Sequence, residues 1–133
     1  MIKISKISLR WLRQAESDLN AAKNSMNSKN YDWSCFQSQQ AAEKCLKAFL
    51  YNRGYTSIIT HSLKELVMEA EKREQLFSKI KLGAKYLDMF YIPTRYPNGL
   101  AGNLAPFEFY EEEDAKKCIG YAESILTTVK KLI

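Results

Sequence analysis

The chain has 133 residues, of which 46% are hydrophobic and 26% charged, and its formal net charge is +5 at pH 7. This length supports one domain with a single core, and the hydrophobic content excludes an intrinsically disordered chain. Five Gly and three Pro disfavour an all-β fold with many tight turns. No run reaches the roughly 18 apolar residues of a membrane span, and residues 1–6 lack the apolar region of a signal peptide. We therefore expect a cytoplasmic protein that does not enter a membrane.

The spacing of apolar residues predicts two long helices in the first half of the chain. Alternating steps of three and four residues indicate a helix over residues 8–28, with Leu12, Ala15, Leu19, Ala22 and Met26 on one face. A second helix is predicted over residues 32–52, beginning at Asp32 and ending before Gly54. Apolar residues surround most of this second helix, so we expect neighbouring elements to cover it on several sides.

The second helix also carries a group of polar residues within a short span: Gln37, Gln40, Glu43, Lys44 and Lys47. Glu43 and Lys47 are spaced as an i,i+4 ion pair in the more favourable orientation. A stripe that faces solvent explains all five residues. The alternative is that some of these side chains serve a binding site.

Three further helices are predicted in the second half of the chain. Ser62 and Glu65 have the spacing of a capping box, with His61 as N-cap or the residue before it, and local hydrogen bonding is the expected role of that histidine. A fourth helix is predicted over residues 75–92 and is followed by a long loop over 93–109 that holds all three prolines. The last helix opens with acids at 111–114 and ends with Lys130 and Lys131, which matches the helix dipole. The predicted fold is an all-α, antiparallel (up-and-down) bundle of four to five helices.

Cysteine spacing and charge distribution limit the chemistry of the chain. Cys35, Cys45 and Cys118 show no CxxC spacing and are interpreted as small apolar core residues. No cluster of His, Cys and acids has the spacing of metal ligands, so neither a metal site nor a cofactor is predicted. Five of the 15 acids lie within residues 108–114, which leaves the remainder of the chain basic and able to meet a phosphate-bearing partner.

One arginine stands between two prolines after the fourth predicted helix. Pro93 and Pro97 fix their own φ angles and move the residue before each of them out of the helical region. Arg95 is thereby held near Tyr91 and Tyr96. Its guanidinium offers five donors in a fixed fork, which suits phosphate or carboxylate, and it stacks on aromatic rings. The alternative is a helix stop at which Arg95 caps spare carbonyl groups.

Five segments follow one another along the chain: residues 11–19, 38–48, 60–63, 91–97, and Tyr110 with 114–115. This series resembles the HEPN family (higher eukaryotes and prokaryotes nucleotide-binding), in its sacsin-like, nucleotidyltransferase-associated branch, over residues 11 to 130. The resemblance implies a single HEPN-like helical domain over residues 1–133 that dimerises, with the second and third helices near the shared cleft. Many members work beside a small nucleotidyltransferase in two-gene modules of the toxin–antitoxin kind. Some members bind nucleotides, and others are metal-independent ribonucleases.

The ribonuclease members of this family carry an Arg that is followed, after four to six residues, by a His. Arg95 would be that Arg, but Leu100, Ala101 and Gly102 occupy the positions where the His should stand. The one histidine of the chain, His61, comes before Arg95 instead. The sequence therefore departs from the ribonuclease motif at its acid–base residue, because an arginine that stays charged is a poor proton shuttle.

The sequence thus predicts a non-catalytic, homodimeric protein that binds a nucleotide or phosphate and works with a nucleotidyltransferase-type partner. Its candidate binding residues are Arg95 for phosphate, Tyr91 or Tyr96 for base stacking, the neighbouring Thr94, Lys44 and Lys47 for added positive charge, and Asp88 for a salt bridge that orients Arg95. Asp88 is equally well explained as an ordinary surface carboxylate. Two alternatives are a metal-independent HEPN ribonuclease toxin with a divergent site built on Arg95 and His61, and a pure protein-interaction module. RNA is the less favoured ligand.

Overall fold

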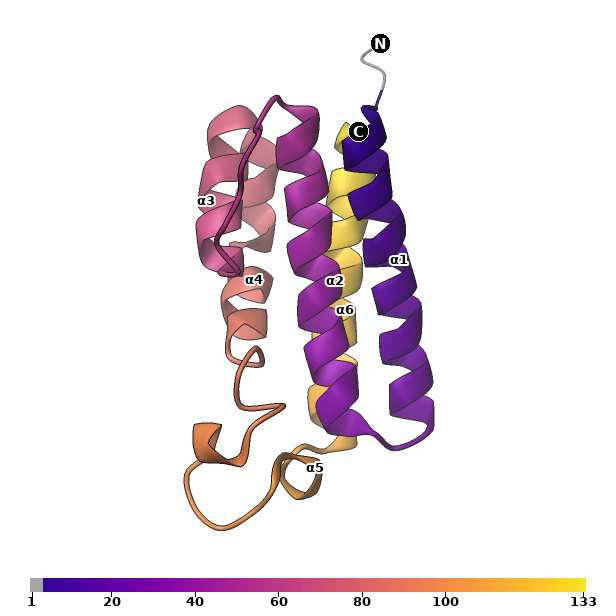
Figure 1. Cartoon of the computed structure of the whole chain (residues 1–133), viewed down its shortest axis with the longest axis vertical. Coiled ribbons are helices and arrows are strands. Elements are labelled where there is room, and N and C mark those ends of the chain that lie inside the picture. The colour runs from indigo at the N-terminus through magenta and orange to yellow at the C-terminus, as the bar shows by residue number, and fades with distance from the viewer. Residues whose placement is uncertain (1–3) are drawn as a thin grey trace.

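The computed structural model describes residues 4–133, so part of the chain start considered above, residues 1–3, lies outside the described residues. Within this range the helices are α1 (Lys6–Asn27), α2 (Tyr31–Asn52), α3 (Leu63–Arg73), α4 (Lys81–Asp88), α5 (Pro106–Phe109) and α6 (Glu112–Leu132), with 3₁₀ helices η1 (Gln75–Ile80) and η2 (Pro97–Gly99). The long helices α1, α2 and α6 lie side by side, and the shorter α3 and α4 line one edge (Figure 1). The predicted all-α bundle is confirmed, with the four-residue α5 added to the five expected helices. No helix within residues 4–133 is long and apolar enough to cross a membrane.

Helix α2 is the centre of the bundle and packs against α1, α3 and α6. Its side chains Ala41, Ala42 and Ala48 are fully buried, and such small residues let neighbouring helices approach closely. Farther along α2, the Phe49 ring meets Phe77 of η1 edge to face, with 4.5 Å between ring centroids. The expectation that neighbours cover α2 on several sides is confirmed.

The three cysteines are free and buried in this core. Burial raises the pKa of Cys45 and of Cys118 well above the ordinary value for a thiol. Both thiols therefore stay protonated and unreactive at neutral pH. Their interpretation as small apolar core residues is confirmed.

The helix ends follow the capping signals of the sequence. Ser62 Oγ accepts a hydrogen bond of 3.3 Å from the backbone amide of Glu65 at the start of α3. The backbone amide of Glu111 donates to Asp114 Oδ2 at 2.9 Å at the start of α6. Gly54, just beyond α2, has φ +94°, which a residue without Cβ adopts at low cost. Helices α1 and α2 begin and end within two residues of their predicted bounds.

The predicted helix over residues 75–92 is wrong in type at its start and in length at its end. Residues 75–80 are the 3₁₀ helix η1, and α4 stops at Asp88. Backbone amides of Met89 and Phe90 then bond three residues back, to the carbonyls of Tyr86 and Leu87, which tightens the last turn. A helix continuing through Pro93 would bring the proline ring against the carbonyl four residues earlier, so the chain turns before it.

Candidate ligand-binding site at the Arg95 loop

The loop that follows α4 is folded into tight turns that present Arg95. The backbone amides of Arg95 and Tyr96 both donate to the carbonyl of Ile92, at 3.1 and 3.3 Å. Thr94 is 2% exposed, and its hydroxyl donates to the carbonyl of Phe90 at 2.6 Å. The hydroxyl of Thr94 therefore fastens the loop, and these contacts do not support its expected role in ligand binding.

The guanidinium of Arg95 lies among three aromatic rings. Its Cζ atom is 4.4 Å from the ring centroid of Phe36, 4.7 Å from Tyr91 and 5.1 Å from Tyr96. Its Nε donates to the carbonyl of Tyr91 at 2.9 Å, so the carbonyl-capping alternative is also realised. Within residues 4–133 this is the one hydrogen bond recorded for the guanidinium, which leaves its terminal nitrogens for an anion.

Phe36 is the member of this cluster that sequence reasoning missed. It lies on α2, 59 positions before Arg95, and its ring centroid is 6.2 Å from that of Tyr91. The apolar pattern of α2 predicted it as one of many core residues. The sequence offered one signal, the aromatic pair Trp33 and Phe36 near the start of α2. That pair does not indicate a contact with Arg95, because the two segments are far apart along the chain.

His61 joins the same cluster through Tyr91. The two rings are stacked with 5.2 Å between centroids and 17° between planes. Nδ1 of His61 lies 3.0 Å from Oε2 of Glu43, and the His61 side chain is 56% exposed. Ser62 is the N-cap of α3, so His61 is the residue before the cap, which was one of its two predicted positions. The expected local hydrogen bonding of its side chain is wrong, because the imidazole contacts α2 and the Arg95 loop instead.

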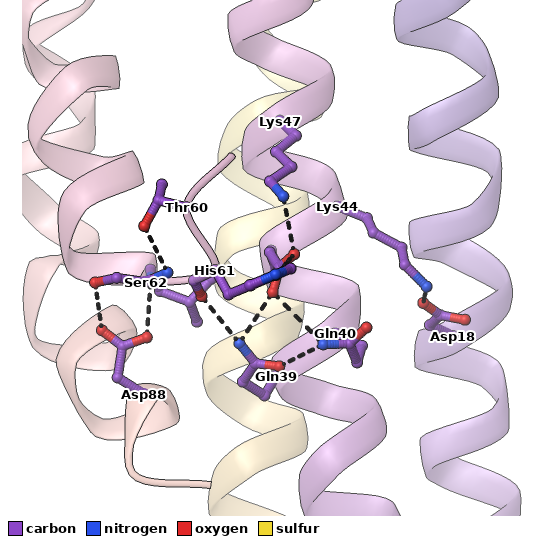
Figure 2. A network of polar contacts seen from close by, with 11 residues as sticks. Asp18, Gln39, Gln40, Lys44, Lys47, Thr60, His61, Ser62 and Asp88 are labelled. Atoms are coloured by element: carbon purple, nitrogen blue, oxygen red, sulfur yellow. Dashed lines mark hydrogen bonds and ion pairs between the residues drawn. The ribbon is translucent and has the colours of Figure 1, made fainter. Parts of the chain in front are cut away.

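Glu43 is the centre of a buried polar network. Figure 2 shows the residues that contact it, Gln39, Gln40, Lys47 and His61. The side chains of Glu43 and Lys47 are each only 5% exposed, and Lys47 Nζ lies 3.1 Å from Glu43 Oε2. Gln39 and Gln40 also direct their amide groups at the carboxylate, at 3.4 and 3.5 Å. The prediction of a solvent-facing stripe is therefore wrong for Glu43 and Lys47, whereas their predicted i,i+4 pairing is confirmed.

The burial of this network has a physical cause in the chain around it. The segment before α3 carries His61 across α2, where the carbonyl of His61 accepts a hydrogen bond from Gln39 at 3.4 Å. On the other side, Lys47 Nζ lies 5.6 Å from the centroid of the Trp11 ring of α1. A buried carboxylate is tolerated here because cationic and amide donors surround it.

The two lysines expected to attract a ligand are paired within the molecule. Lys47 is held by Glu43, and Lys44 Nζ lies 2.6 Å from Oδ2 of Asp18 on α1. Because each ammonium already has a carboxylate partner, neither adds free positive charge beside Arg95. Their expected role in ligand binding is not supported by these contacts.

Asp88 is placed differently from the sequence-based expectation. Its carboxylate accepts hydrogen bonds from the backbone amides of Leu63 at 2.7 Å and Lys64 at 3.0 Å. The hydroxyl of Ser62 also donates a hydrogen bond to Oδ2 of Asp88, at 3.3 Å (Figure 2). The predicted salt bridge to Arg95 is wrong, because the unpaired amides and positive dipole end of α3 bind this carboxylate.

The site therefore combines one fixed cation, several aromatic rings and one exposed imidazole. Among residues 4–133, no three His, Cys, Asp or Glu side chains are grouped so that they could hold a metal ion. The guanidinium suits an anion such as phosphate, and the ring of Tyr96, a residue 49% exposed, offers a face to a planar group.

Comparison with known sequences gives two matches over nearly the whole chain. The family model described as the HEPN domain matches residues 8–132. The candidate toxin MJ1304 of Methanocaldococcus jannaschii is 30% identical over 140 residues, which cover 99% of this chain and 90% of that relative.

Solved structures show the same fold. TT1696 from Thermus thermophilus has a TM-score of 0.91 and 31% identity, covering 97% of this chain and 100% of its own. ST0689, an archaeal HEPN homologue, has a TM-score of 0.78 and 36% identity, covering 94% of this chain and 96% of its own. A HEPN domain protein from Thermotoga maritima follows with a TM-score of 0.72 and 27% identity, covering 92% and 96%.

Proposed function

Because the chain belongs to the HEPN family, we propose that it is a toxin-like HEPN protein whose Arg95 site binds the phosphate of a nucleotide. The observation that carries this proposal is the guanidinium of Arg95 held among three aromatic rings. The rings and the carbonyl of Tyr91 fix the side chain, so little rotamer freedom remains to be lost on binding. Phosphate meets the terminal nitrogens, and the base stacks on Tyr96.

The proposal includes the wider setting of the protein. It acts as a homodimer in the cytoplasm, together with a nucleotidyltransferase-type partner. The name of the M. jannaschii relative, a candidate toxin, supports the toxin-like role. The partner is proposed from the two-gene modules that the family resemblance implies. The binding role itself needs no metal and no resident cofactor.

A thermal-shift panel tests the binding role directly. ATP, GTP, AMP and inorganic phosphate are each added to the wild-type protein, and a ligand that binds only the folded state raises Tm by mass action. Arg95→Ala should cost about 1.5–3 kcal/mol of affinity, the usual contribution of a hydrogen bond to a charged group. Arg95→Lys should recover only part of that loss, because a point charge lacks the bidentate fork.

Arg73→Ala is a matched control for this experiment. Arg73 also places its Cζ atom over a ring, 5.3 Å from the centroid of Tyr55, but it lies at the end of α3. It should leave the ligand-induced shift unchanged. Equal shifts in wild type and Arg95→Ala would overturn the proposed binding site.

The ring contacts also change the expected effect of Arg95→Ala on stability. The sequence alone predicted little change in the unliganded protein. Three contacts of a partly exposed cation with aromatic rings contribute about 0.5–1 kcal/mol each, so a loss of roughly 1.5–3 kcal/mol is now expected. Affinities are therefore compared at a temperature at which both variants are folded.

RNA cleavage is a second candidate function, and the pairing of His61 with Glu43 favours it. If Nδ1–H donates to the Glu43 carboxylate, Nε2 keeps a lone pair that can accept the proton of a 2′-hydroxyl. Arg95, linked to His61 through Tyr91, would stabilise the phosphorane. An RNA-degradation assay on wild type, His61→Ala and Arg95→Ala decides the matter. Cleavage that disappears in both variants supports this function, and an inactive wild type excludes it.

A further inference from the structure

The aromatic rings around Arg95 continue to a tryptophan in the first turn of α2. The ring centroid of Phe36 lies 4.4 Å from Arg95 Cζ and 6.2 Å from the centroid of Trp33, which meets it edge to face. The start of α2 and the loop that follows α4 lie at the same end of the bundle (Figure 1). Trp33 therefore extends the Arg95 site by one ring, which neither the phosphate contact nor the base on Tyr96 uses.

The two outer members of this row of rings are the exposed ones. Trp33 and Tyr96 are each 49% exposed, whereas Phe36 and Tyr91 are half-buried. Tyr91 is stacked on His61, and Phe36 is contacted by the guanidinium, by Trp33 and by Tyr91. The inner rings are thus covered by neighbours in the same chain, and the outer two offer a face to a ligand.

The rings of Phe36 and Tyr96 approach the guanidinium from different directions. Their centroids lie 4.4 and 5.1 Å from Arg95 Cζ, yet no contact between these two rings is found within residues 4–133. Because Trp33 lies beyond Phe36, Trp33 and Tyr96 flank the cation on opposite sides. A phosphate held by the terminal nitrogens of Arg95 then has one exposed ring on each side.

The position of Trp33, rather than its exposure, is what indicates a ligand. A single exposed aromatic ring is ordinary on a protein surface, and covering Phe36 is a sufficient structural role for it. Trp33, however, stands beside a guanidinium for which the described part of the chain supplies one carbonyl and no carboxylate. A cation that is free to bind an anion, with rings on both sides, is the arrangement that binds nucleotides joined through phosphate.

We propose that Trp33 stacks on a second nucleobase, so that the ligand of the Arg95 site is a dinucleotide unit. Its phosphodiester binds Arg95, one base stacks on Tyr96, and the other stacks on Trp33. The two bases are splayed apart, since the cation and Phe36 separate the two exposed rings. The inference rests on the proposed phosphate-binding function and extends it from one base to two. A free dinucleotide and a segment of a single strand share this chemistry.

Calorimetric titration with two ligands of equal charge tests the second stacking site. One ligand is 2′-O-methyl ApA, which has two adenines and no 2′-hydroxyl that could be used for cleavage. The other is the methyl ester of AMP, which has one adenine on the same kind of phosphodiester. Trp33→Ala should weaken ApA binding by at least about fivefold, the low end of what stacking of one base contributes, and leave binding of the methyl ester unchanged. Arg95→Ala should weaken the binding of both.

Trp33→Phe and Leu82→Ala are the matched variants. Trp33→Phe keeps a smaller ring and should recover part of the ApA affinity. Stacking of adenine on Trp33 should also quench indole fluorescence in the wild type, and this quenching should vanish in Trp33→Phe, in which Trp11 is the remaining tryptophan. Leu82 is 72% exposed on α4 and lies outside the row of rings, so Leu82→Ala should change neither affinity. Melting curves confirm that each variant is folded.

The outcomes separate the second base from the proposed function. Equal ApA affinities of wild type and Trp33→Ala overturn the stacking site, and a methyl ester whose binding still requires Arg95 then leaves the nucleotide site intact. A wild type that binds neither ligand overturns both. Weaker self-association of Trp33→Ala with normal ApA affinity assigns the ring to a contact between copies and likewise overturns the inference. A 2′-O-methyl adenine hexamer that binds as tightly as ApA identifies a strand as the ligand, and one that does not bind identifies a free dinucleotide.

Discussion

The Glu43 network and the Arg95 cluster are neighbouring polar regions that use charge in opposite ways. Glu43 is buried, and Lys47, His61 and two glutamine amides surround its carboxylate. Arg95 is half-buried against rings and one carbonyl, and no carboxylate partner is recorded for it within residues 4–133. A charge that the fold neutralises internally contributes to the fold. A charge that the fold only positions remains available to an anionic ligand.

The largest effect is expected from breaking the internally neutralised region. Glu43→Ala leaves Lys47 buried without its partner and should cost about 3–5 kcal/mol of unfolding free energy. Urea unfolding of the purified variant measures this loss. Glu43→Gln should recover part of it, because the amide keeps an acceptor for the surrounding donors.

Glu123→Ala is the matched control for Glu43→Ala. Glu123 also pairs with a lysine, at 3.0 Å from Lys23, but both side chains are about half exposed. Its loss should cost only about 0–1 kcal/mol. Equal effects at Glu43 and Glu123 would show that burial of the Glu43 pair is not what stabilises it.

An intermediate effect is expected at Asp88, which binds the start of α3. Asp88→Ala removes hydrogen bonds to two backbone amides at the start of α3 and should cost about 1–2 kcal/mol of stability. The affinity of the Arg95 site for phosphate should not change. A variant of normal stability that binds ligand weakly would instead restore the idea that Asp88 orients Arg95.

The fold was predictable from the sequence because its signals are local. Apolar periodicity located α1, α2 and α6, and Ser62 and Gly54 marked the start of α3 and the end of α2. The extent of α4 was not predictable in the same way. Its apolar period continues to Tyr91, but the start of α3 engages Asp88 and Pro93 prevents a longer helix.

The site was predictable only where one short segment contains it. Arg95, Tyr91 and Tyr96 stand within six positions and do meet in space. The two lysines differ in what the sequence could show: the spacing predicted the pairing of Lys47 with Glu43, whereas Lys44 meets Asp18 of α1, which lies 26 positions before it. No pattern along the chain distinguishes a lysine that faces solvent from one that a distant carboxylate will neutralise.

The smallest effect concerns the tyrosines beneath the Arg95 loop and is an alkaline loss of stability. The ring of Phe90, whose carbonyl holds Thr94, contacts the rings of Tyr86 and Tyr110 with centroids 5.1 and 5.7 Å apart. Desolvation by burial raises the pKa of both tyrosines to about 12, from an ordinary value of 10.0.

Between these two pKa values the unfolded chain releases phenol protons that the folded chain retains, so stability must fall as pH rises from 10 towards 12. Below pH 10 this contribution is fully present. Tyr110→Phe removes one of the two phenols, and the difference between its unfolding free energy and that of wild type should change by on the order of 1 kcal/mol over that range. Urea unfolding at pH 8, 10 and 11 measures this difference, and lysine titration cancels because it is common to both proteins.

Phosphate affinity at pH 7.5 should be the same in both, since Tyr110 supports the loop without contacting the guanidinium. A parallel decline in the two proteins would mean that the phenol of Tyr110 ionises as freely in the folded state as in the unfolded one.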